Sequence, residues 1–202
     1  MQQEIKPALG CTEPIAVALA VAKAKETLGC LPQRVELWVS CNILKNAMGV
    51  GIPGTGMAGL PIAIALGALI GKSGYQLEVL RDCTPEAVER GKKFIAQGGI
   101  SIIQDKEACD NLYVDVVCKK GNHRSEAIIA HEHTRLVYLC IDNNVMLDER
   151  SSLHKASVGE TDSDLTLRQV FDFATQTSIK ELAEIAQRLL TQPLFPEAGK
   201  LL

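Results

Sequence analysis

Residues 11–29 read CTEPIAVALAVAKAKETLG, and this stretch predicts an alanine-rich helix that other elements can approach closely. Thr12 is expected to cap the helix, with Glu13 and Pro14 in its first turn, and Gly29 is expected to end it. Every second position from 16 to 24 is alanine, so the helix carries little side-chain bulk on any face. The stretch is therefore typical of a helix against which neighbours pack.

Cys11 stands directly before this helix, after Gly10 and within the loop Lys6–Pro14. Backbone N–H groups at a helix start have no intrahelical partner, and the helix dipole adds positive potential there. We expect this position to lower the pKa of the thiol or to hold an anion. A small buried apolar side chain is the alternative interpretation of the cysteine.

The remaining pattern predicts an α+β fold, with helices packed on one face of a mostly antiparallel sheet. A half-buried strand is expected at 34–40, and a helix is expected at 60–70. A further helix is expected from Pro85 to about Gln97, with Thr84 as its N-cap. A strand is expected at 76–80, and an antiparallel meander is expected at 100–103, 112–118, 127–131, 136–141 and 145–147.

We expect one domain over residues 1–158 and a linker with helices over 159–202. The linker is the polar run 159–164, a helix is expected at 165–174, and a capping box at Ser178–Glu181 is expected to open another helix. The apolar run 194–202 is expected to lead into a missing C-terminal half, or to support self-association.

Composition and charge exclude several classes of protein. The formal net charge of −3 argues against nucleic acid as a partner. No export signal opens the chain, and glycines and prolines interrupt the uncharged stretch 47–71, so no membrane span is expected. The 7 cysteines, without an export signal, indicate a reducing, cytoplasmic compartment. They contain no CxxC pair, so any metal site must be assembled from distant parts of the fold.

Two overlapping GxGxxG matches, at 49–54 and 54–59, raise the question of a dinucleotide site. That fingerprint requires a tight turn directly after a strand, whereas about eight residues separate Gly49 from the preceding strand, and Pro53 lacks an N–H group. We expect this flexible backbone to approach another anion or cofactor.

Two further groups carry polar chemistry. Lys45 and Asn46 are expected on a loop before the glycine-rich segment, where they could bind a carboxylate or supply a base. Solvated, turn-forming roles are the alternative for this pair. His131-Glu132-His133 would place two imidazoles on one strand face as a metal pair, although two solvated or structurally bonded histidines are the favoured interpretation.

Taken together, KPALGCTEPIAVALA, VSCNILKNAMGVGIPGTGMAGLPIAIALGAL and LEVL resemble the N-terminal half of the L-cysteine desulfidase / UPF0597 (YhaM-like) family. That family is related to the α chain of iron–sulfur L-serine dehydratases. The resemblance is specific from about Glu4 to Leu80 and looser through the meander, where His133-Thr134 resembles a family pair.

The resemblance implies a [4Fe–4S]-dependent lyase that eliminates H₂S or water from a small amino acid and gives pyruvate and ammonia. It implies that Cys11 is a cluster ligand and that the other ligands come from a C-terminal half that this chain lacks. It makes Lys45 and Asn46 the candidate catalytic residues. The candidate substrate-binding residues are Thr12, Glu13, Asn42, Gly54, Thr55, Gly56 and His133.

Alone, this chain is expected to be inactive. The first alternative is a cluster-free module of the same family that binds a small molecule or a partner through the loops around Lys45 and Gly54. The second alternative is a dinucleotide-dependent enzyme.

Overall fold

The structure is a computed structural model that describes residues 8, 10–108, 110–150, 167–181, 183 and 187. The chain divides into two compact units, Ala8–Ala156 and a smaller unit that contains helix α5 (Leu167–Gln176). The predicted boundary between 158 and 159 lies outside the described residues, as do Cys109 and the apolar run 194–202.

The larger unit alternates helices and strands in its first hundred residues and is mostly strand after that. Its helical elements are α1 (Thr12–Leu28), α2 (Cys41–Ala47), α3 (Leu60–Leu69), the 3₁₀ segment η1 (Ser73–Glu78) and α4 (Pro85–Ala96). Its strands are β1 (Arg34–Val39), β2 (Gly51–Ile52), β3 (Met57–Ala58), β4 (Ile100–Gln104), β5 (Tyr113–Lys120), β6 (His123–Ala130), β7 (Leu136–Ile141) and β8 (Asn144–Asp148).

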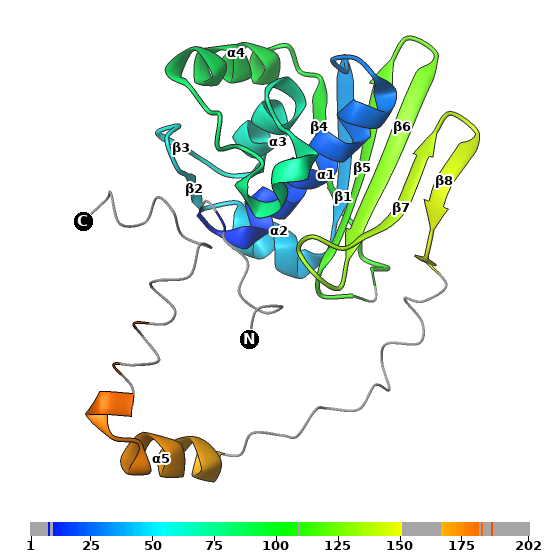
Figure 1. Cartoon of the computed structure of the whole chain (residues 1–202). Coiled ribbons are helices and arrows are strands. Elements are labelled where there is room, and N and C mark those ends of the chain that lie inside the picture. The colour runs from blue at the N-terminus through cyan, green and yellow to red at the C-terminus, as the bar shows by residue number, and fades with distance from the viewer. Residues whose placement is uncertain are drawn as a thin grey trace. The chain divides into compact units, whose positions relative to one another are not determined.

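The helices cover one face of a six-stranded sheet, which confirms the predicted α+β class. Figure 1 shows α1 between the sheet and α3, with α4 on the far side of α3. Because α1 has neighbours on two sides, it is apolar nearly all round, and each alternate alanine from 16 to 24 is fully buried.

The sheet has the order β4-β1-β5-β6-β7-β8, and every pairing is antiparallel except β1 with β4. The predicted meander is confirmed for β5 to β8, but β4 is not part of it. The segment between β1 and β4 contains three α-helices, and such a long crossover allows the two strands to run parallel.

One predicted strand is wrong. Residues 76–80 are expected from the sequence as a strand, but they contribute the end of η1 and a following turn, and Gln76 has φ +53°. The short alternation LEVL has the period of a strand, yet Leu77, Val79 and Leu80 are all buried against the helices instead.

Helices α1 and α3 approach at backbone distance through small residues. A Cβ atom built on Gly67 would lie 2.7 Å from the carbonyl oxygen of Ala18, and one built on Gly71 would lie 2.9 Å from the Cβ of Ala22. Gly67 lies within α3, whereas Gly71 follows the end of that helix at Leu69, so the close contact with α1 continues into the segment after α3. The alanine-rich sequence of α1 is thus explained by its contact with α3.

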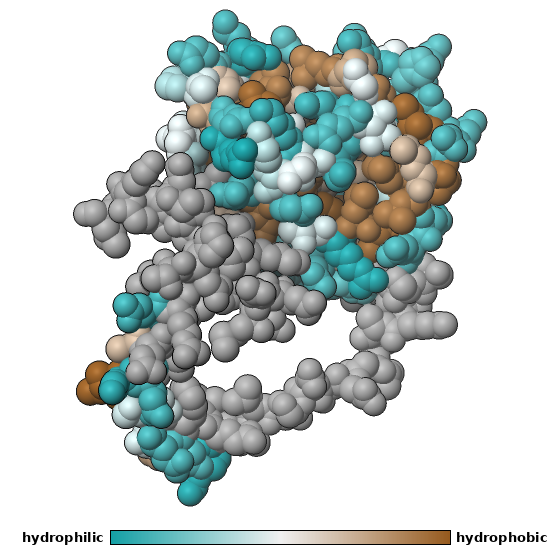
Figure 2. All heavy atoms as spheres, in the orientation of Figure 1, coloured by the Kyte–Doolittle hydropathy of each residue, from teal (hydrophilic) through white to brown (hydrophobic). Residues whose placement is uncertain are grey.

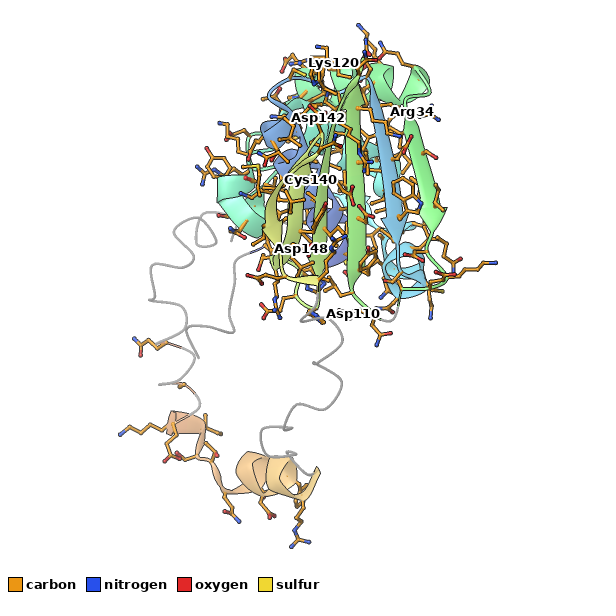
Figure 3. All side chains as sticks on the ribbon, turned by 90° about the vertical axis from the view of Figure 1, so that its right-hand side faces the viewer. Arg34, Asp110, Lys120, Cys140, Asp142 and Asp148 are labelled. Atoms are coloured by element: carbon orange, nitrogen blue, oxygen red, sulfur yellow. The ribbon has the colours of Figure 1, made fainter. Side chains whose placement is uncertain are left out.

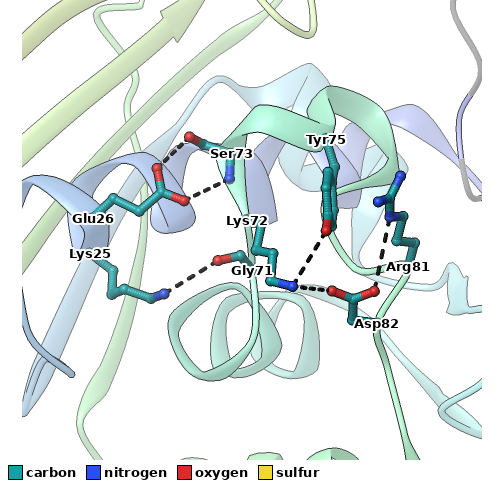
Figure 4. A network of polar contacts seen from close by, with 8 residues as sticks. All are labelled: Lys25, Glu26, Gly71, Lys72, Ser73, Tyr75, Arg81 and Asp82. Atoms are coloured by element: carbon teal, nitrogen blue, oxygen red, sulfur yellow. Dashed lines mark hydrogen bonds and ion pairs between the residues drawn. The ribbon is translucent and has the colours of Figure 1, made fainter.

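Polar contacts fix the C-terminal half of α1 to the segment that follows α3 (Figure 4). Glu26 accepts hydrogen bonds from the backbone N–H and the hydroxyl of Ser73, the former at 2.8 Å, and Lys25 donates to the carbonyl oxygen of Gly71 at 3.3 Å. On the solvent side, the Arg81 guanidinium stacks on the Tyr75 ring, 3.4 Å from its centroid. The close contact of α1 and α3 is therefore held at this end by partly buried hydrogen bonds.

The other face of the sheet carries polar groups among apolar ones, and Figure 3 shows it from that side. Asp115 of β5 lies on this face, and one of its carboxylate oxygens is buried without a hydrogen-bond partner in the described part of the chain. Burial, reinforced by the charge of Glu126, raises the pKa of Asp115 to about 7. This carboxyl group is therefore an unfavourable charge in the folded protein above neutral pH.

Hydrophobic surface is concentrated beside β6 and β7 in the view of Figure 2. Leu136, Leu139 and Ile141 of β7 are only half-buried. Val145 and Met146 of the edge strand β8 are exposed by 51% and 60%. The helix layer therefore leaves this end of the sheet partly uncovered. Among the described residues, no helix is both long enough and apolar enough to cross a membrane.

The smaller unit confirms two predictions made from the sequence. Helix α5 matches the helix expected at 165–174, within the residues that are described. The capping box is also present, because the Glu181 backbone N–H donates to the Ser178 hydroxyl at 3.2 Å while Ser178 N–H donates to the Glu181 carboxylate at 2.9 Å.

Substituting Gly67 with alanine tests the helix contact. Alanine favours a helix over glycine by about 1 kcal/mol, but its methyl group would collide with the Ala18 carbonyl. We expect Gly67→Ala to lower the free energy of unfolding by about 2 kcal/mol, measured by urea denaturation. Gly74→Ala is the matched control, because a Cβ there meets nothing within 4 Å. Equal stability of the two variants would contradict close contact.

Substituting Asp115 with asparagine tests the buried carboxyl group. Its pKa is about 7 when folded, against 3.8 for the free group, so the folded state binds more protons between these values. Stability is therefore lost as the pH rises through this window. We expect Asp115→Asn to raise the free energy of unfolding at pH 8 by about 2 kcal/mol and to change little near pH 4. An equal effect at both pH values would contradict the assignment.

Candidate functional site

The loop that carries Cys11 packs against the glycine-rich hairpin formed by β2 and β3. Gly10 has φ +92°, and a Cβ atom at this position would lie 2.9 Å from the ring carbons of Pro53. Only glycine meets both requirements without strain or displacement of the proline. Gly10 thus sets the cysteine beside the hairpin, although the two segments are about 40 residues apart in sequence.

Cys11 itself is the N-cap of α1, so the prediction that Thr12 holds this position is wrong by one residue. The backbone of Cys11 is extended, with φ −66° and ψ 134°, and Thr12 is already the first helical residue. The Cys11 side chain makes no capping hydrogen bond and turns to Glu13 instead.

The Cys11 thiol donates a hydrogen bond to the Glu13 carboxylate, with 2.8 Å between Sγ and Oε2. This contact raises the pKa of Cys11, with a further contribution from burial, and lowers the pKa of Glu13. The expected lowering of the thiol pKa is therefore wrong in direction. Backbone N–H groups of Thr12 and Glu13 do favour the thiolate, but the adjacent carboxylate outweighs them.

His133 lies near Cys11 and Glu13, although it comes from a distant part of the sequence. Its charge contributes to the lowered pKa of Glu13, which places the imidazole near the carboxylate. His133 lies in the turn between β6 and β7, together with His131 and Glu132. Of the two interpretations of these histidines, the pair of imidazoles on a strand face is wrong, because β6 ends at Ala130 and His131 leaves the strand with φ +67°. The alternative of a structurally bonded histidine is confirmed for His131, which is bonded to Asp110.

The glycine-rich hairpin presents backbone rather than side chains. Gly54 and Gly56 have φ +76° and +63°, and a methyl group added to either would meet nothing within 4 Å, so their surroundings are open. The Thr55 hydroxyl is buried and donates to the carbonyl oxygen of Ile52 at 2.7 Å, while it accepts from Met57 N–H at 3.0 Å. Gly54, Thr55 and Gly56 are predicted substrate-binding residues, and the hydroxyl of Thr55 makes hydrogen bonds that close the hairpin turn.

Asn42, Lys45 and Asn46 lie on helix α2, not on the loop that was predicted. Ser40 begins this helix as its N-cap, and its hydroxyl also donates to the carbonyl oxygen of Asn111 at 2.7 Å. Asn42 and Lys45 are exposed, and Asn46 donates to the side chain of Asn42 at 3.4 Å. The α2 helix packs against α1 and leaves Asn42 and Lys45 exposed and Asn46 half-buried.

A cavity of about 220 Å³ adjoins the first turns of α1. Its wall joins α1, the hairpin tip and the segment before α4, and it consists of Ile15, Ile52, Pro53, Gly54, Leu80, Arg81 and Cys83. Burial raises the pKa of the Cys83 thiol. No sequence pattern indicates this cavity, because residues 76–80 are expected to form a strand and not to turn back toward α1.

The structure thus brings Cys11, Glu13 and His133 together, with Thr12 alongside and Gly54 near the same loop. Among the described residues, no group of three or more His, Cys, Asp or Glu side chains is arranged to hold a metal ion. Cys11 can therefore supply one thiolate ligand, and a complete ligand set is not found within the described ranges.

The comparisons with known proteins identify close relatives. The chain is 54% identical over 182 residues to a UPF0597 protein of Bacteroides thetaiotaomicron, which covers 90% of this chain and 42% of the relative. It is 53% identical over 187 residues to a UPF0597 protein of Bacteroides fragilis, covering 93% and 44%. A UPF0597 protein of Aeromonas hydrophila is 38% identical over 201 residues, covering 98% and 46%.

This chain therefore spans less than half the length of these relatives. No family model matches the chain. No solved structure matches it.

Replacing Glu13 tests the contact that controls the thiol. Glu13→Gln removes the negative charge that holds the proton on Cys11, so the pKa of the thiol should fall. We expect iodoacetamide to alkylate Cys11 about 3- to 10-fold faster at pH 7.5, as the thiolate is the nucleophile. Mass spectrometry of the digested protein measures this rate, and the exposed Cys41 on α2 serves as the internal control. An unchanged rate at Cys11 would contradict the proposed contact.

Proposed function

Because its similarity to UPF0597 proteins along nine tenths of its length makes this chain a member of that family, we propose that it forms part of an amino-acid lyase. In this proposal a [4Fe–4S] cluster is bound where Cys11 meets the remaining portion of a longer protein. The reaction is elimination of H₂S from L-cysteine, or of water from L-serine, to give pyruvate and ammonia.

The observation that carries the proposal is the setting of Cys11. Its side chain is only partly buried, stands at the start of a helix, and is surrounded by the glycine hairpin, Glu13 and His133. A thiol must lose its proton to bind iron. Glu13 holds that proton on Cys11 in the structure, so cluster binding in this proposal requires the contact between Glu13 and the thiol to change. When bound, the cluster would supply a Lewis-acidic iron that polarises the bond to the leaving group.

The remaining site residues have roles in substrate binding in this proposal. The open backbone of Gly54 and Gly56 and the side chains of Thr12 and His133 bind the amino acid. Asn42, Lys45 and Asn46 lie on the exposed side of α2, where an ammonium and two amides suit a carboxylate. They would act from there only on a substrate enclosed by further protein.

A second candidate function is a cluster-free module that binds a small molecule. The cavity of about 220 Å³ beside α1 favours it, since the wall is mainly apolar and includes one charged residue, Arg81. The protonated state of the Cys11 thiol is also compatible with a role other than ligation.

Anaerobic reconstitution with iron and sulfide distinguishes these functions. The chain would be mixed with the part of the Bacteroides thetaiotaomicron relative that lies outside the matched segment, and bound iron and pyruvate release from L-cysteine and L-serine would be recorded. We expect iron and pyruvate in the mixture only, and loss of both in Cys11→Ala. Cys41→Ala is the matched control, because Cys41 is exposed on α2.

Iron binding that survives Cys11→Ala would contradict the role of this cysteine. A mixture that binds an amino acid but neither iron nor sulfide would favour the binding module.

A further inference from the structure

His131 is held in a conformation that a histidine rarely adopts. Its φ of +67° lies in the left-handed region, which costs a non-glycine residue about 1–2 kcal/mol. Two contacts with one oxygen of Asp110 maintain it: the backbone N–H of His131 donates at 2.8 Å, and the ring Nδ1 lies at 2.7 Å. Strain of this kind, fixed by surrounding hydrogen bonds, is concentrated at functional sites.

The contact with Asp110 determines which ring nitrogen carries the proton. A carboxylate only accepts hydrogen bonds, so Nδ1 must donate, and in the neutral imidazole Nε2 then holds a free electron pair. Nε2 is buried and has no hydrogen-bond partner in the described part of the chain. An unpaired buried acceptor costs about 1–3 kcal/mol, so this nitrogen is held in an unfavourable setting.

The position of this pair links it to the site around Cys11. His131 lies in the turn between β6 and β7, and Figure 1 shows this turn at the same end of the sheet as the start of α1 and helix α2. On its other side, Asp110 is followed by Asn111, whose carbonyl oxygen accepts the hydrogen bond from Ser40 at the start of α2. The pair thus lies at the end of the sheet where α2 begins.

A second histidine–aspartate pair in the same sheet has none of these properties. Nδ1 of His123 lies 2.9 Å from Asp142, but its side chain is exposed by 73%, against 18% for His131. Figure 3 shows Asp142 toward the other end of the sheet from Asp110. Burial, strain and an unpaired Nε2 therefore distinguish the His131 pair from an ordinary surface contact.

We propose that His131 is the base that removes the Cα proton of the amino-acid substrate, and that Asp110 is its positioning residue. This inference rests on the proposed lyase function and names a residue for its proton transfer. Lys45 is the weaker candidate, because a lysine acts as a base when it is desolvated, and Lys45 is exposed.

In the step itself, Nε2 takes the Cα proton, and the electron pair of that C–H bond forms the Cα–Cβ double bond. The Cβ–S or Cβ–O bond breaks, and its electron pair goes to the leaving group, which receives the proton from Nε2 and departs as H₂S or water. The aminoacrylate product tautomerises, and hydrolysis by one water gives pyruvate and ammonia.

The test uses the same two-part mixture in D₂O, with deuterium incorporation at Cα of recovered L-serine and L-cysteine measured together with pyruvate release. In His131→Asn the amide can still donate to Asp110, and asparagine tolerates positive φ, so the fold is retained. We expect this variant to lose both exchange and kcat by about 100-fold or more, with KM nearly unchanged. His123→Asn is the matched control and should leave both rates within about twofold.

Two further measurements separate a catalytic role from a structural one. Asp110→Asn should increase the kinetic isotope effect of Cα-deuterated substrate, because proton transfer becomes slower. In ¹⁵N-histidine-labelled protein, NMR should show His131 with its proton on Nδ1 and not on Nε2.

Exchange that persists in His131→Asn, or a proton on Nε2, would overturn the assignment even if the mixture is an iron-dependent lyase. Loss of exchange in His131→Asn in a mixture without iron would refute the cluster proposal and support the base. A wild-type mixture with neither exchange nor pyruvate would overturn both.

Discussion

The backbone contact between α1 and α3 is the constraint on which the rest of this structure depends. Gly67 and Gly71 leave room for Ala18 and Ala22, so α1 can lie between the sheet and a second helix with apolar contacts on both sides. A larger residue at any of these positions would move α1 away from one of its neighbours. The position of its N-terminus, and hence of Cys11, follows from this packing.

The candidate site is formed where loops from distant parts of the sequence meet at one end of the sheet. The Cys11 loop rests on Pro53 through Gly10, the turn after β6 brings His131 and His133, and the segment before β5 brings Asp110. Rigid helices and strands thus position side chains that are themselves on loops. Two of the polar groups at this end shift each other's pKa in opposite directions: the contact raises the pKa of Cys11 and lowers the pKa of Glu13.

Local signals in the sequence were sufficient to predict the ends of two helices. Thr84 caps α4 as predicted, since its hydroxyl accepts from Ala87 N–H at 3.2 Å, and Gly29 ends α1 with φ +75°. The sequence was not sufficient where a property depends on the orientation of a side chain or on a contact between residues that are far apart in the sequence. The thiol pKa depends on how the Glu13 side chain turns, and the pairing of His131 with Asp110 joins residues that no spacing rule connects. That pair could be recognised only once the pairing of β5 with β6 was known, because this pairing brings the two residues together.

The single parallel pairing in the sheet bears on the order in which the protein folds. Strand β1 lies between β4 and β5, so its partners follow it by about 65 and 83 residues, as Val35 pairs with Ile100 and with Cys118. Hairpins such as β5–β6 close short loops, whereas β1 must wait for its partners to be synthesised and for a long loop to close. A high contact order of this kind slows folding. We therefore expect the meander to form first, and the insertion of β1 with α1 to be the late step that completes the site.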